Sequence, residues 1–429
     1  MTDALSLVDD WGPEKIVVVS HRRTGMKGVL VIDNTARGLG KGGTRMSPTV
    51  SVGEIARLAR VMTWKWASVD LCYGGAKAGI VADPRSPDKE AILRAFARAL
   101  SNEVPREYVM GLDMGLTEDD AAIIQDELGD RGAAVGTPEH LGGVAYDRLG
   151  VTGYGVAEAT DAAARHLGLP LADSRVALQG FGAVGTAAAV RFAELGATVV
   201  AVSTATGALH DPGGLDVPAL LAAREEHGDD FVRHHSGGTV IAPGRELTVD
   251  CDILVPAALQ DVIDDGNAHE IKAGLVVEGA NLPTSAQAQE ILAQRGITVL
   301  PDFVANAGGV VAAAFAMDAR HSGFRPGTAR IFDTISDRLR ANAVTVLEEA
   351  RRRETTPHLA GRSLAEDRVR AAMLSKGRVP RGARRGPGPR TGPEPGRADN
   401  TRPVTCPPAR HTEHRSGPRG TDDGAQPCP

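Results

Sequence analysis

Two lysines about a dozen residues apart are the residues of this chain best suited to chemistry. Lys65 stands in Met62-Thr63-Trp64-Lys65-Trp66, and Lys77 stands in Gly74-Gly75-Ala76-Lys77-Ala78-Gly79. Because glycines and small residues frame Lys77, we expect close packing and little water there, and desolvation lowers the pKa of a lysine. An amine that loses its proton near neutral pH can act as general acid and base at a carbonyl or iminium carbon. An isolated motif of this kind would instead favour a glycine turn with a solvated lysine.

A carboxylate is the third candidate. The short apolar run 108–110 predicts a strand, and Gly111-Leu112-Asp113-Met114-Gly115 follows it directly. An aspartate between glycines at a strand end can point its carboxylate into a cleft. The alternative is a turn aspartate that hydrogen-bonds the nearby backbone.

The predicted elements bring the two lysines together. Apolar residues at helical spacing predict a helix over 52–67, with Lys65 in its last turn. A glycine loop carrying Lys77 follows, and 78–82 predicts a strand. Both lysines therefore flank one connection and can converge on one pocket. Upstream, 16–20 and 29–32 predict a pair of strands, and 88–103 predicts another helix.

A glycine fingerprint begins about a hundred residues later. The apolar strand expected at 175–179 leads into a GxGxxG turn, a helix over 186–195 and a strand over 198–203. In this setting glycines permit a tight turn, the approach of a pyrophosphate and close helix packing, and the helix N-terminus favours the phosphates. The alternative is a purely structural glycine turn. The residues predicted to surround the pyrophosphate are Gly180, Phe181, Gly182, Ala183, Val184 and Gly185.

The strand after this helix does not end in the usual acid. Ser203 is followed by Thr204-Ala205-Thr206-Gly207. An acid there would hydrogen-bond the ribose hydroxyls of NAD, whereas an arginine would accommodate the 2′-phosphate of NADP. Neither residue type stands close to Ser203 in the sequence. The cofactor is therefore predicted as NAD or NADP.

Further alternation of strands and helices completes this half. Strands are expected at 251–256, 275–278 and 298–300, in a parallel sheet, and helices at 310–317, 329–352 and 364–373. Ligands bind beyond the carboxyl ends of strands in open α/β sheets. Asn281 and Asn306 follow two of these strands, so they are placed to meet a nicotinamide amide or the substrate, unless they cap helices.

Length and composition indicate an α/β protein with two domains. A chain of 429 residues with 42% hydrophobic side chains exceeds what one core usually holds. We expect domains at 1–150 and 151–318, C-terminal helices at 319–376 packing back on the first domain, and a disordered tail at 377–429. The tail is rich in arginine, proline and glycine, so it cannot build a core. Binding of RNA or an acidic partner is a weaker reading of it than an unselected extension or a shifted reading frame.

Charge and cysteine content exclude several classes of protein. The net charge of −6 gives no general attraction to nucleic acid or anionic membrane, no apolar run is long enough to span a bilayer, and no signal sequence opens the chain, so we expect a cytoplasmic protein. None of the four cysteines forms a CxxC, so neither a disulfide framework nor a zinc or other metal site is indicated. Cys72, near Lys77, has no histidine partner and is expected to be a buried, inert thiol.

Several ordered blocks together resemble the glutamate/leucine/phenylalanine/valine dehydrogenases over roughly 15–373. The resemblance implies a substrate-binding and oligomerisation domain followed by a Rossmann domain, and reductive amination of 2-oxo acids with ammonia and NAD(P)H. It also implies a homo-oligomer, since relatives form dimers, hexamers or octamers through the first domain. The blocks are Gly42-Gly43-Thr44-Arg45-Met46, Met62-Thr63-Trp64-Lys65, Gly74-Gly75-Ala76-Lys77, Leu112-Asp113-Met114-Gly115, Thr152-Gly153-Tyr154-Gly155-Val156, the glycine fingerprint, Glu278-Gly279-Ala280-Asn281 and Ala305-Asn306-Ala307-Gly308-Gly309.

The same resemblance implies roles for single residues. Lys65 would bind the α-carboxylate of the substrate, Lys77 would activate water and polarise the carbonyl, and Asp113 would carry protons to and from the amine. The other site residues that the resemblance implies fall into two groups, one for the substrate and one for the cofactor. Gly42, Gly43 and Met62 belong with the substrate, and Thr152, Thr204, Asn281 and Asn306 belong with the cofactor.

The substrate side chain is less clear from the sequence. Lys41 matches the position where glutamate-specific members carry a lysine for the side-chain carboxylate, and leucine-type members carry an apolar residue there. Ala313 stands where glutamate enzymes use a serine, and the short segment 17–46 looks more like the leucine/valine branch. A cation buried against an aliphatic side chain would cost several kcal/mol, so glutamate is the first expectation and a leucine-, valine- or phenylalanine-type substrate the alternative. Lys41 could also extend to solvent. A catalytically silent, cofactor-binding regulatory subunit is disfavoured because Lys65, Lys77 and Asp113 are all present.

Overall fold

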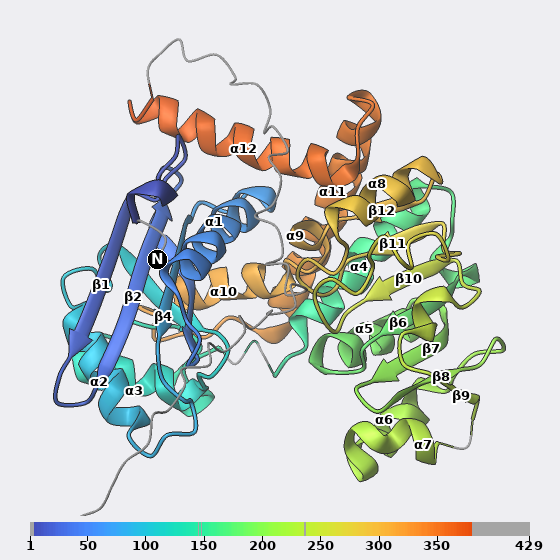
Figure 1. Cartoon of the computed structure of the whole chain (residues 1–429), viewed down its shortest axis with the longest axis horizontal. Coiled ribbons are helices and arrows are strands. Elements are labelled where there is room, and N and C mark those ends of the chain that lie inside the picture. Colours follow the sequence, from blue (N-terminus) through green and yellow to red (C-terminus); the bar gives the residue numbers. More distant parts are fainter. Residues whose placement is uncertain (1–3, 145, 147, 236, 380–429) are drawn as a thin grey trace, which may run out of the picture. The chain divides into compact units, whose positions relative to one another are not determined.

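The computed structural model describes residues 4–144, 146, 148–235 and 237–379, and its first sheet has five strands in the order β1-β2-β4-β3-β5 (Figure 1). β1 and β2 form an antiparallel hairpin, β2 is antiparallel to β4, and β3 lies between β4 and β5 with parallel pairing to both. The strands are β1 (Lys15–His21), β2 (Met26–Asn34), β3 (Gly40–Met46), β4 (Gly74–Ile80) and β5 (Tyr108–Leu112).

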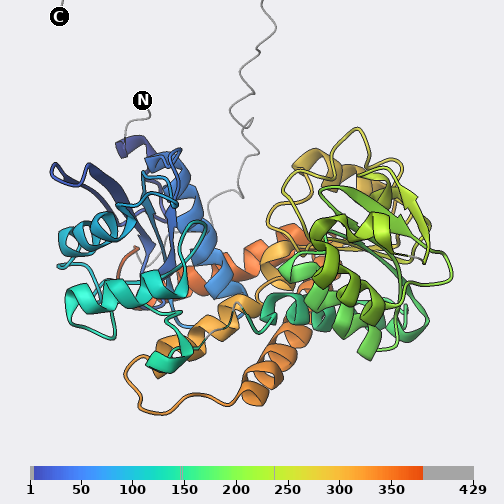
Figure 2. The ribbon, with the colours of Figure 1, turned by 90° about the horizontal axis from the view of Figure 1, so that it is seen from below.

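Helices cover both faces of this sheet (Figure 2). Alternate residues of β2 face opposite sides, as strand geometry requires. Val29 and Val31 pack with Ile55 of α1, whereas Leu30 packs with Phe96 of α2. The helices that follow the strands in this part of the chain are α1 (Val52–Ser68), α2 (Lys89–Ala99) and α3 (Glu118–Leu128). Ser51 caps α1 by accepting a hydrogen bond from the backbone N–H of Glu54.

The second sheet has seven strands in the order β12-β11-β10-β6-β7-β8-β9. The first five of these are parallel, and β8 and β9 add an antiparallel edge. Its parallel strands are short apolar runs because helices bury both of their faces. The strands are β6 (Arg175–Gln179), β7 (Thr198–Thr204), β8 (Gly207–His210), β9 (Thr239–Ile241), β10 (Ile253–Pro256), β11 (Leu275–Val277) and β12 (Thr298–Leu300).

The helices of this half pack on the two faces of the sheet and on one another. On one face Leu178 joins Phe192 of α5, and on the other Leu254 joins Leu292 of α8. The helices are α4 (Val151–His166), α5 (Ala183–Glu194), α6 (Val217–His227), α7 (Phe231–His234), α8 (Ala286–Gln294), α9 (Asp302–Ala305), α10 (Gly308–Ala319), α11 (Thr328–Arg352) and α12 (Pro357–Ser375).

A buried acid ties three of these helices together. Glu158 of α4 accepts hydrogen bonds from Arg191 of α5 at 2.7 Å and from Arg340 of α11 at 2.9 Å. Burial alone would raise the pKa of Glu158, but these partners and Ser336 hold it below its usual value. A buried carboxylate with this many donors is compensated, so the network fixes α4, α5 and α11 relative to one another.

The last helix packs against the first one. Arg368 of α12 donates hydrogen bonds to the carbonyl oxygens of Ala67 and Ser68, at 2.7 Å each. These carbonyls end α1, where the helix itself provides no partner. α12 therefore caps the helix that carries Lys65.

The expected fold class is confirmed, with differences in single elements. The segment Gly40–Met46 forms the central strand β3, which the sequence did not predict because its glycines weaken any strand pattern. Lys77 lies inside β4 rather than in a loop, and α12 begins at Pro357 rather than Leu364. The domain boundaries remain a proposal. Of the tail predicted at 377–429, residues 377–379 are described and Arg378 hydrogen-bonds Glu14 and Thr35, whereas the rest lies outside the described residues.

Three further findings concern membrane-spanning helices, metal sites and Cys72. No helix in the described part of the chain is long and apolar enough to cross a membrane. Within the same residues, no group of three or more histidine, cysteine or acidic side chains is arranged to hold a metal ion. The expectation for Cys72 is wrong: its thiol is exposed in the loop after α1, with its sulfur 3.9 Å from Arg37.

Candidate active site

Lys77 and Asp113 form an ion pair at the centre of the first sheet. Lys77 lies in β4 and is buried, and Asp113 directly follows β5, two strands away. Burial would raise the pKa of Asp113, but the charges of Lys77 and Arg45 and the backbone N–H of Met114 hold it below its usual value. The pair therefore places the amine of Lys77 beside an ionised carboxylate, an arrangement through which a proton can be exchanged.

Glycines in β3 make room for this pair between its two neighbouring strands. A methyl group at Gly43 would lie 2.7 Å from Cβ of Asp113 and 3.1 Å from Nζ of Lys77. One at Gly42 would lie 1.7 Å from the carbonyl oxygen of Ala76 and 3.4 Å from Cγ of Met62. These predicted substrate residues are thus beside the ion pair, and a larger residue at either glycine would displace the backbone.

Lys41 is the most buried of the three lysines, with 2% of its surface exposed. Its Nζ donates only long hydrogen bonds, to the carbonyl oxygens of Val109 at 3.4 Å and Gly42 at 3.5 Å. Burial, with the neighbouring charges of Lys77 and Arg320, lowers the pKa of Lys41 to about 7. The side chain does not extend to solvent, and no carboxylate among the described residues forms an ion pair with it.

Lys65 reaches from the first part of the chain to the second. It lies in the last turn of α1, and its Nζ donates a hydrogen bond to Oδ1 of Asn281 at 2.9 Å. Burial lowers the pKa of Lys65, the charge of Asp302 opposes that shift, and the charge of Lys77 adds to it. The structure thus brings together the residues predicted for the substrate carboxylate and for the nicotinamide.

The loop that carries Asn281 is held by buried polar groups that the sequence analysis did not single out. Asp302 accepts hydrogen bonds from the backbone N–H groups of Phe303 at 2.6 Å and Leu282 at 2.9 Å, and its own N–H donates to Glu278 at 2.9 Å. Leu282 has a φ of +50°, a conformation that non-glycine residues seldom adopt. Asp302 therefore stabilises a strained loop next to Asn281.

Asn306 supports the same loop from the other side. Its Nδ2 donates to the carbonyl oxygens of Gly279 and Ala280 and to Oδ1 of Asn281, at 3.2 to 3.3 Å. Asn306 also ends α9, so it is both a helix cap and a neighbour of Asn281. Its buried Oδ1 has no hydrogen-bond partner in the described chain, which leaves an acceptor for an amide or amine.

The glycine turn after β6 has the geometry that a pyrophosphate requires. Gly180 has a φ of +95°, and a methyl group at Gly185 would lie 1.9 Å from the carbonyl oxygen of Gly180. A methyl group at Gly182 would meet no atom of the described residues within 4 Å, so this position leaves open space before the N-terminus of α5. These residues fit a dinucleotide, with the first N–H groups of α5 at Ala183 and Val184 as phosphate donors.

Other predicted residues lie around this turn and at the ends of neighbouring helices. Thr152 is in the first turn of α4, beside Gly309 at the start of α10, and Ala313 is buried within α10. Thr204 ends β7, and its hydroxyl donates to the carbonyl oxygen of Asp229 at 2.8 Å. The ring of Phe181 is buried against Phe231, so only its backbone could meet a cofactor.

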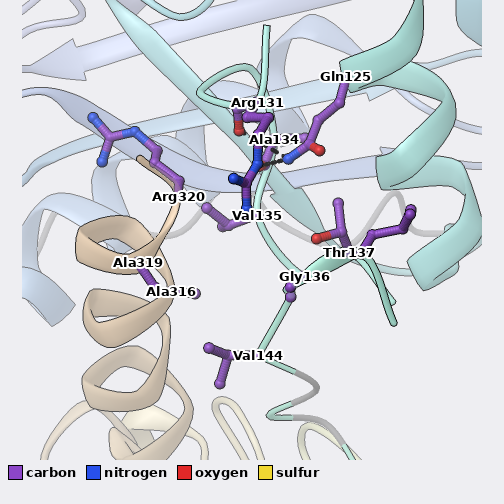
Figure 3. A pocket seen from close by; sticks show the side chains of 13 residues that line it. Gln125, Arg131, Ala134, Val135, Gly136, Thr137, Val144, Ala316, Ala319 and Arg320 are labelled. Atoms are coloured by element: carbon purple, nitrogen blue, oxygen red, sulfur yellow. Dashed lines mark hydrogen bonds between the residues drawn. The ribbon is translucent and has the colours of Figure 1, made fainter. Parts of the chain in front are cut away.

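A small pocket lies between the segment 131–144 and the end of α10 (Figure 3). Gln125 closes one end by donating hydrogen bonds to the carbonyl oxygens of Arg131 and Ala134 at 2.8 Å. Arg320 lines the pocket, and its charge also acts on Lys41. Lys41, Lys65 and Lys77 are not among its lining residues, so the pocket adjoins the lysine site rather than forming it.

The arrangement can bind and convert a molecule with an anionic end and a reactive carbon. Lys65 offers a cation near Asn281, and Lys77 and Asp113 offer a donor and an acceptor for protons. Lys41 offers a second buried cation. β6 and β10 are parallel, so their carboxyl ends meet at one edge of the sheet, where the N–H of Ala257 donates to the carbonyl oxygen of Gln179 at 2.7 Å.

Comparisons with known proteins show the family to which the chain is related. A family model described as glutamate/leucine/phenylalanine/valine dehydrogenase matches residues 142–377, and one described as the dimerisation domain of these dehydrogenases matches residues 13–130. The chain is 36% identical over 355 residues to an NAD-specific glutamate dehydrogenase of Staphylococcus aureus, which covers 80% of this chain and 84% of that protein.

Solved structures give the same result. A hetero-hexameric glutamate dehydrogenase from Thermus thermophilus in a Leu-bound form aligns with a TM-score of 0.76 and 30% identity, covering 87% of this chain and 93% of that one. A glutamate dehydrogenase from Peptoniphilus asaccharolyticus aligns with a TM-score of 0.76 and 27% identity, covering 88% and 95%.

Proposed function

Because the chain belongs to the glutamate/leucine/phenylalanine/valine dehydrogenase family, we propose that it catalyses the reversible oxidative deamination of L-glutamate to 2-oxoglutarate and ammonia with NAD or NADP. The observation that carries the choice of glutamate is Lys41. This lysine is 2% exposed, makes long hydrogen bonds to two carbonyl oxygens, and has no anionic partner among the residues that the structure describes. The side-chain carboxylate of glutamate would supply that partner, and burying a charge without one is costly.

The other residues of the site take roles that follow from their positions. Lys65 binds the α-carboxylate through the N–H donors of its Nζ that the hydrogen bond to Asn281 does not use. In amination, Nζ of Lys77 donates a proton toward the oxygen of the 2-oxo group and so polarises it. In deamination, the same nitrogen without that proton accepts one from the attacking water, and Asp113 is the paired group that can exchange it. Asp113, whose carboxylate is ionised, takes protons from the amine and returns them. Arg45, with its Nε 3.5 Å from Asp113, keeps that carboxylate in place.

The cofactor residues complete the site. When bound, the nicotinamide accepts a hydride from the α-carbon of the amino acid. Gly180, Gly182 and Gly185 with the N-terminus of α5 hold the pyrophosphate, and Thr152, Asn281 and Asn306 orient the amide end.

A second substrate class has one observation in its favour. Ala313 is buried in α10 and offers no hydroxyl, which a side-chain carboxylate would need as a second donor. A pKa of about 7 also lets Lys41 become neutral near physiological pH. A leucine-, valine- or phenylalanine-type amino acid is therefore the alternative substrate.

One experiment separates these substrates. The purified full chain is offered a panel of 2-oxo acids with ammonia, and the oxidation of NADH and of NADPH is followed separately by absorbance. We expect 2-oxoglutarate to give the highest kcat/KM. A higher value for the 2-oxo acid of leucine, valine or phenylalanine would overturn the assignment to glutamate, and no turnover of any 2-oxo acid would overturn the activity itself.

We further propose a homo-oligomer in which β1 takes part. β1 lies at the edge of the first sheet, and Val18 on it is 69% exposed. An edge strand with unpaired backbone groups readily pairs with a second chain. Light scattering on the purified chain tests this, and a monomer would contradict it. Cytoplasmic localisation stays a prediction.

A further inference from the structure

The strand that follows the glycine turn ends without an acid and beside an arginine from elsewhere in the chain. β7 ends at Thr204, and the hydroxyls of Thr204 and Thr206 both donate to the carbonyl oxygen of Asp229 at 2.8 Å. In dinucleotide-binding folds this strand end faces the adenosine ribose. The contacts with Asp229 bring the segment before α7 against this strand end.

Because of this contact, Arg233 of α7 lies close to the end of β7. Its Nη2 donates a hydrogen bond to the carbonyl oxygen of Thr206 at 3.0 Å. The sequence offers no arginine close to Ser203, so the cation comes from α7, about thirty residues later. Its guanidinium is 60% exposed, and Nη1 lies 3.6 Å from Asp230, which is also largely exposed. An exposed ion pair of this kind contributes little, so an anionic ligand can replace Asp230.

The position of Arg233 is tied to the glycine turn. Phe231, which begins α7, is fully buried, and its ring lies 5.3 Å from the ring of Phe181, centre to centre. Phe181 is the second residue of the glycine turn, and Val232 is buried as well. The helical turn that bears Arg233 is therefore packed onto the same turn that would hold the pyrophosphate.

We propose that Arg233 binds a 2′-phosphate on the adenosine ribose, so that the chain binds NADPH at least as well as NADH. This inference rests on the proposed function, because it assigns one end of the same cofactor site. The planar guanidinium presents paired N–H donors that match two phosphate oxygens. β7 itself ends without the acid that would bind a free ribose hydroxyl, and the carboxylate that the structure pairs with Arg233 is that of Asp230, which the phosphate must displace.

Binding of the reduced cofactors to the full chain tests the proposal without turnover. NADPH and NADH fluorescence titrations are carried out on the wild type, Arg233→Ala and Asp230→Asn. A charge-assisted contact predicts that Arg233→Ala weakens NADPH binding about tenfold or more and leaves NADH binding within about twofold. Asp230→Asn removes the competing carboxylate and should strengthen NADPH binding. Arg245→Ala is the matched control. Arg245 is about as exposed as Arg233 and is paired with Glu270 rather than with a residue near Thr206.

Other results overturn the assignment of Arg233. They are a wild type that binds NADH but not NADPH, an Arg233→Ala variant that loses both cofactors equally, and one that loses neither. None of these outcomes decides the proposed function, because that function is tested by turnover of 2-oxo acids. If NADH binds and 2-oxo acids are aminated while Arg233→Ala changes nothing, only the cofactor assignment is wrong. Adenosine 2′,5′-bisphosphate and adenosine 5′-monophosphate differ only in the 2′-phosphate. Comparing their binding to the wild type and to Arg233→Ala therefore shows whether the effect depends on that phosphate.

Discussion

Nζ of Lys65 donates a hydrogen bond to Oδ1 of Asn281 at 2.9 Å, although 216 residues separate them in the sequence. One belongs to the helix beside the first sheet and the other to a loop of the second. Asn281 accepts one of the three N–H donors that a lysine ammonium offers, so a substrate carboxylate can bind to the others beside it. Residues proposed for the two ligands are thus partners of each other before either ligand binds.

The first prediction separates chemistry from binding. Lys77→Ala should reduce kcat by about a hundredfold to ten-thousandfold, because the general acid and base is removed. NADH should still bind with nearly unchanged affinity, since Lys77 lies in β4, apart from the glycine turn. Steady-state kinetics and a fluorescence titration measure the two effects. Normal turnover in this variant would remove the proposed mechanism.

Lys65→Ala is the comparison for that variant. Loss of a charge-assisted contact to the α-carboxylate should raise KM for the 2-oxo acid about tenfold or more. The effect on KM should exceed that in Lys77→Ala, whereas the effect on kcat should be smaller. Equal losses in both parameters for both lysines would mean that the two roles are not distinct.

The second prediction concerns substrate choice. Lys41→Leu replaces the buried cation with an apolar group, so kcat/KM should shift from 2-oxoglutarate toward the 2-oxo acids of leucine and valine. An unpaired buried carboxylate costs several kcal/mol, so the preference should change by at least about a hundredfold. The ratio of the two kcat/KM values is the measurement. If the wild type already prefers the leucine analogue, the role given to Lys41 is wrong.

The third prediction concerns the pH dependence of binding. The pKa of Lys41 is about 7 in the free protein, and a bound carboxylate would raise it. The affinity for 2-oxoglutarate should therefore be constant below pH 7 and fall by up to tenfold per pH unit above it. Calorimetric titrations between pH 6 and 9 check this. Lys41→Met should lack this slope while keeping any contribution from Lys65.

The fourth prediction concerns Glu278, which is buried beside Asp302. Burial and the charge of Asp302 raise the pKa of Glu278 from 4.5 to about 8. The folded protein thus keeps a proton that the unfolded chain loses, and this stabilisation is complete below about pH 4.5 and lost as the pH rises through 8. Glu278→Gln should be less sensitive to alkaline pH. Thermal unfolding at several values between pH 5 and 9 should show the wild type losing more stability than the variant.

The fifth prediction uses two glycines of one turn. A methyl group at Gly182 has open space, whereas one at Gly185 would lie 1.9 Å from a carbonyl oxygen. Gly182→Ala should therefore fold with a nearly unchanged melting temperature but bind NADH more weakly, because the methyl group occupies the space for the pyrophosphate. Gly185→Ala should lower the melting temperature as well. Equal behaviour of the two variants would argue against a cofactor at this turn.

The sequence was most informative where a motif sits inside one element. The glycine turn between a strand and a helix was predictable because each of its parts has a local signature. The apolar stripe of α11 was predictable for the same reason: Ile331, Ile335 and Leu339 follow helical spacing, and all are buried. The extent of α1 and the position of Lys65 in its last turn followed from the spacing of its apolar residues, and the cap at Ser51 was found only in the structure.

The parts that could not be predicted depend on contacts between distant segments. The glycines of β3 mask its strand pattern, and only the pairing with β4 and β5 makes it a strand. Arg233 reaches Thr206 because α7 packs on Phe181, which no local pattern encodes. Asp302 follows a proline and belongs to no motif in the sequence, and the structure shows that its carboxylate accepts a hydrogen bond from Leu282 in the strained loop.

Arg368 joins the carboxyl end of α1 to the last helix of the described fold. Lys65, the residue proposed to bind the substrate, lies within one helical turn of those two carbonyls, so α12 helps to hold the helix end that positions it. Loss of the Arg368 contacts is therefore expected to disturb Lys65 indirectly. Variants with impaired catalysis are accordingly expected in α12 as well as among the reacting groups.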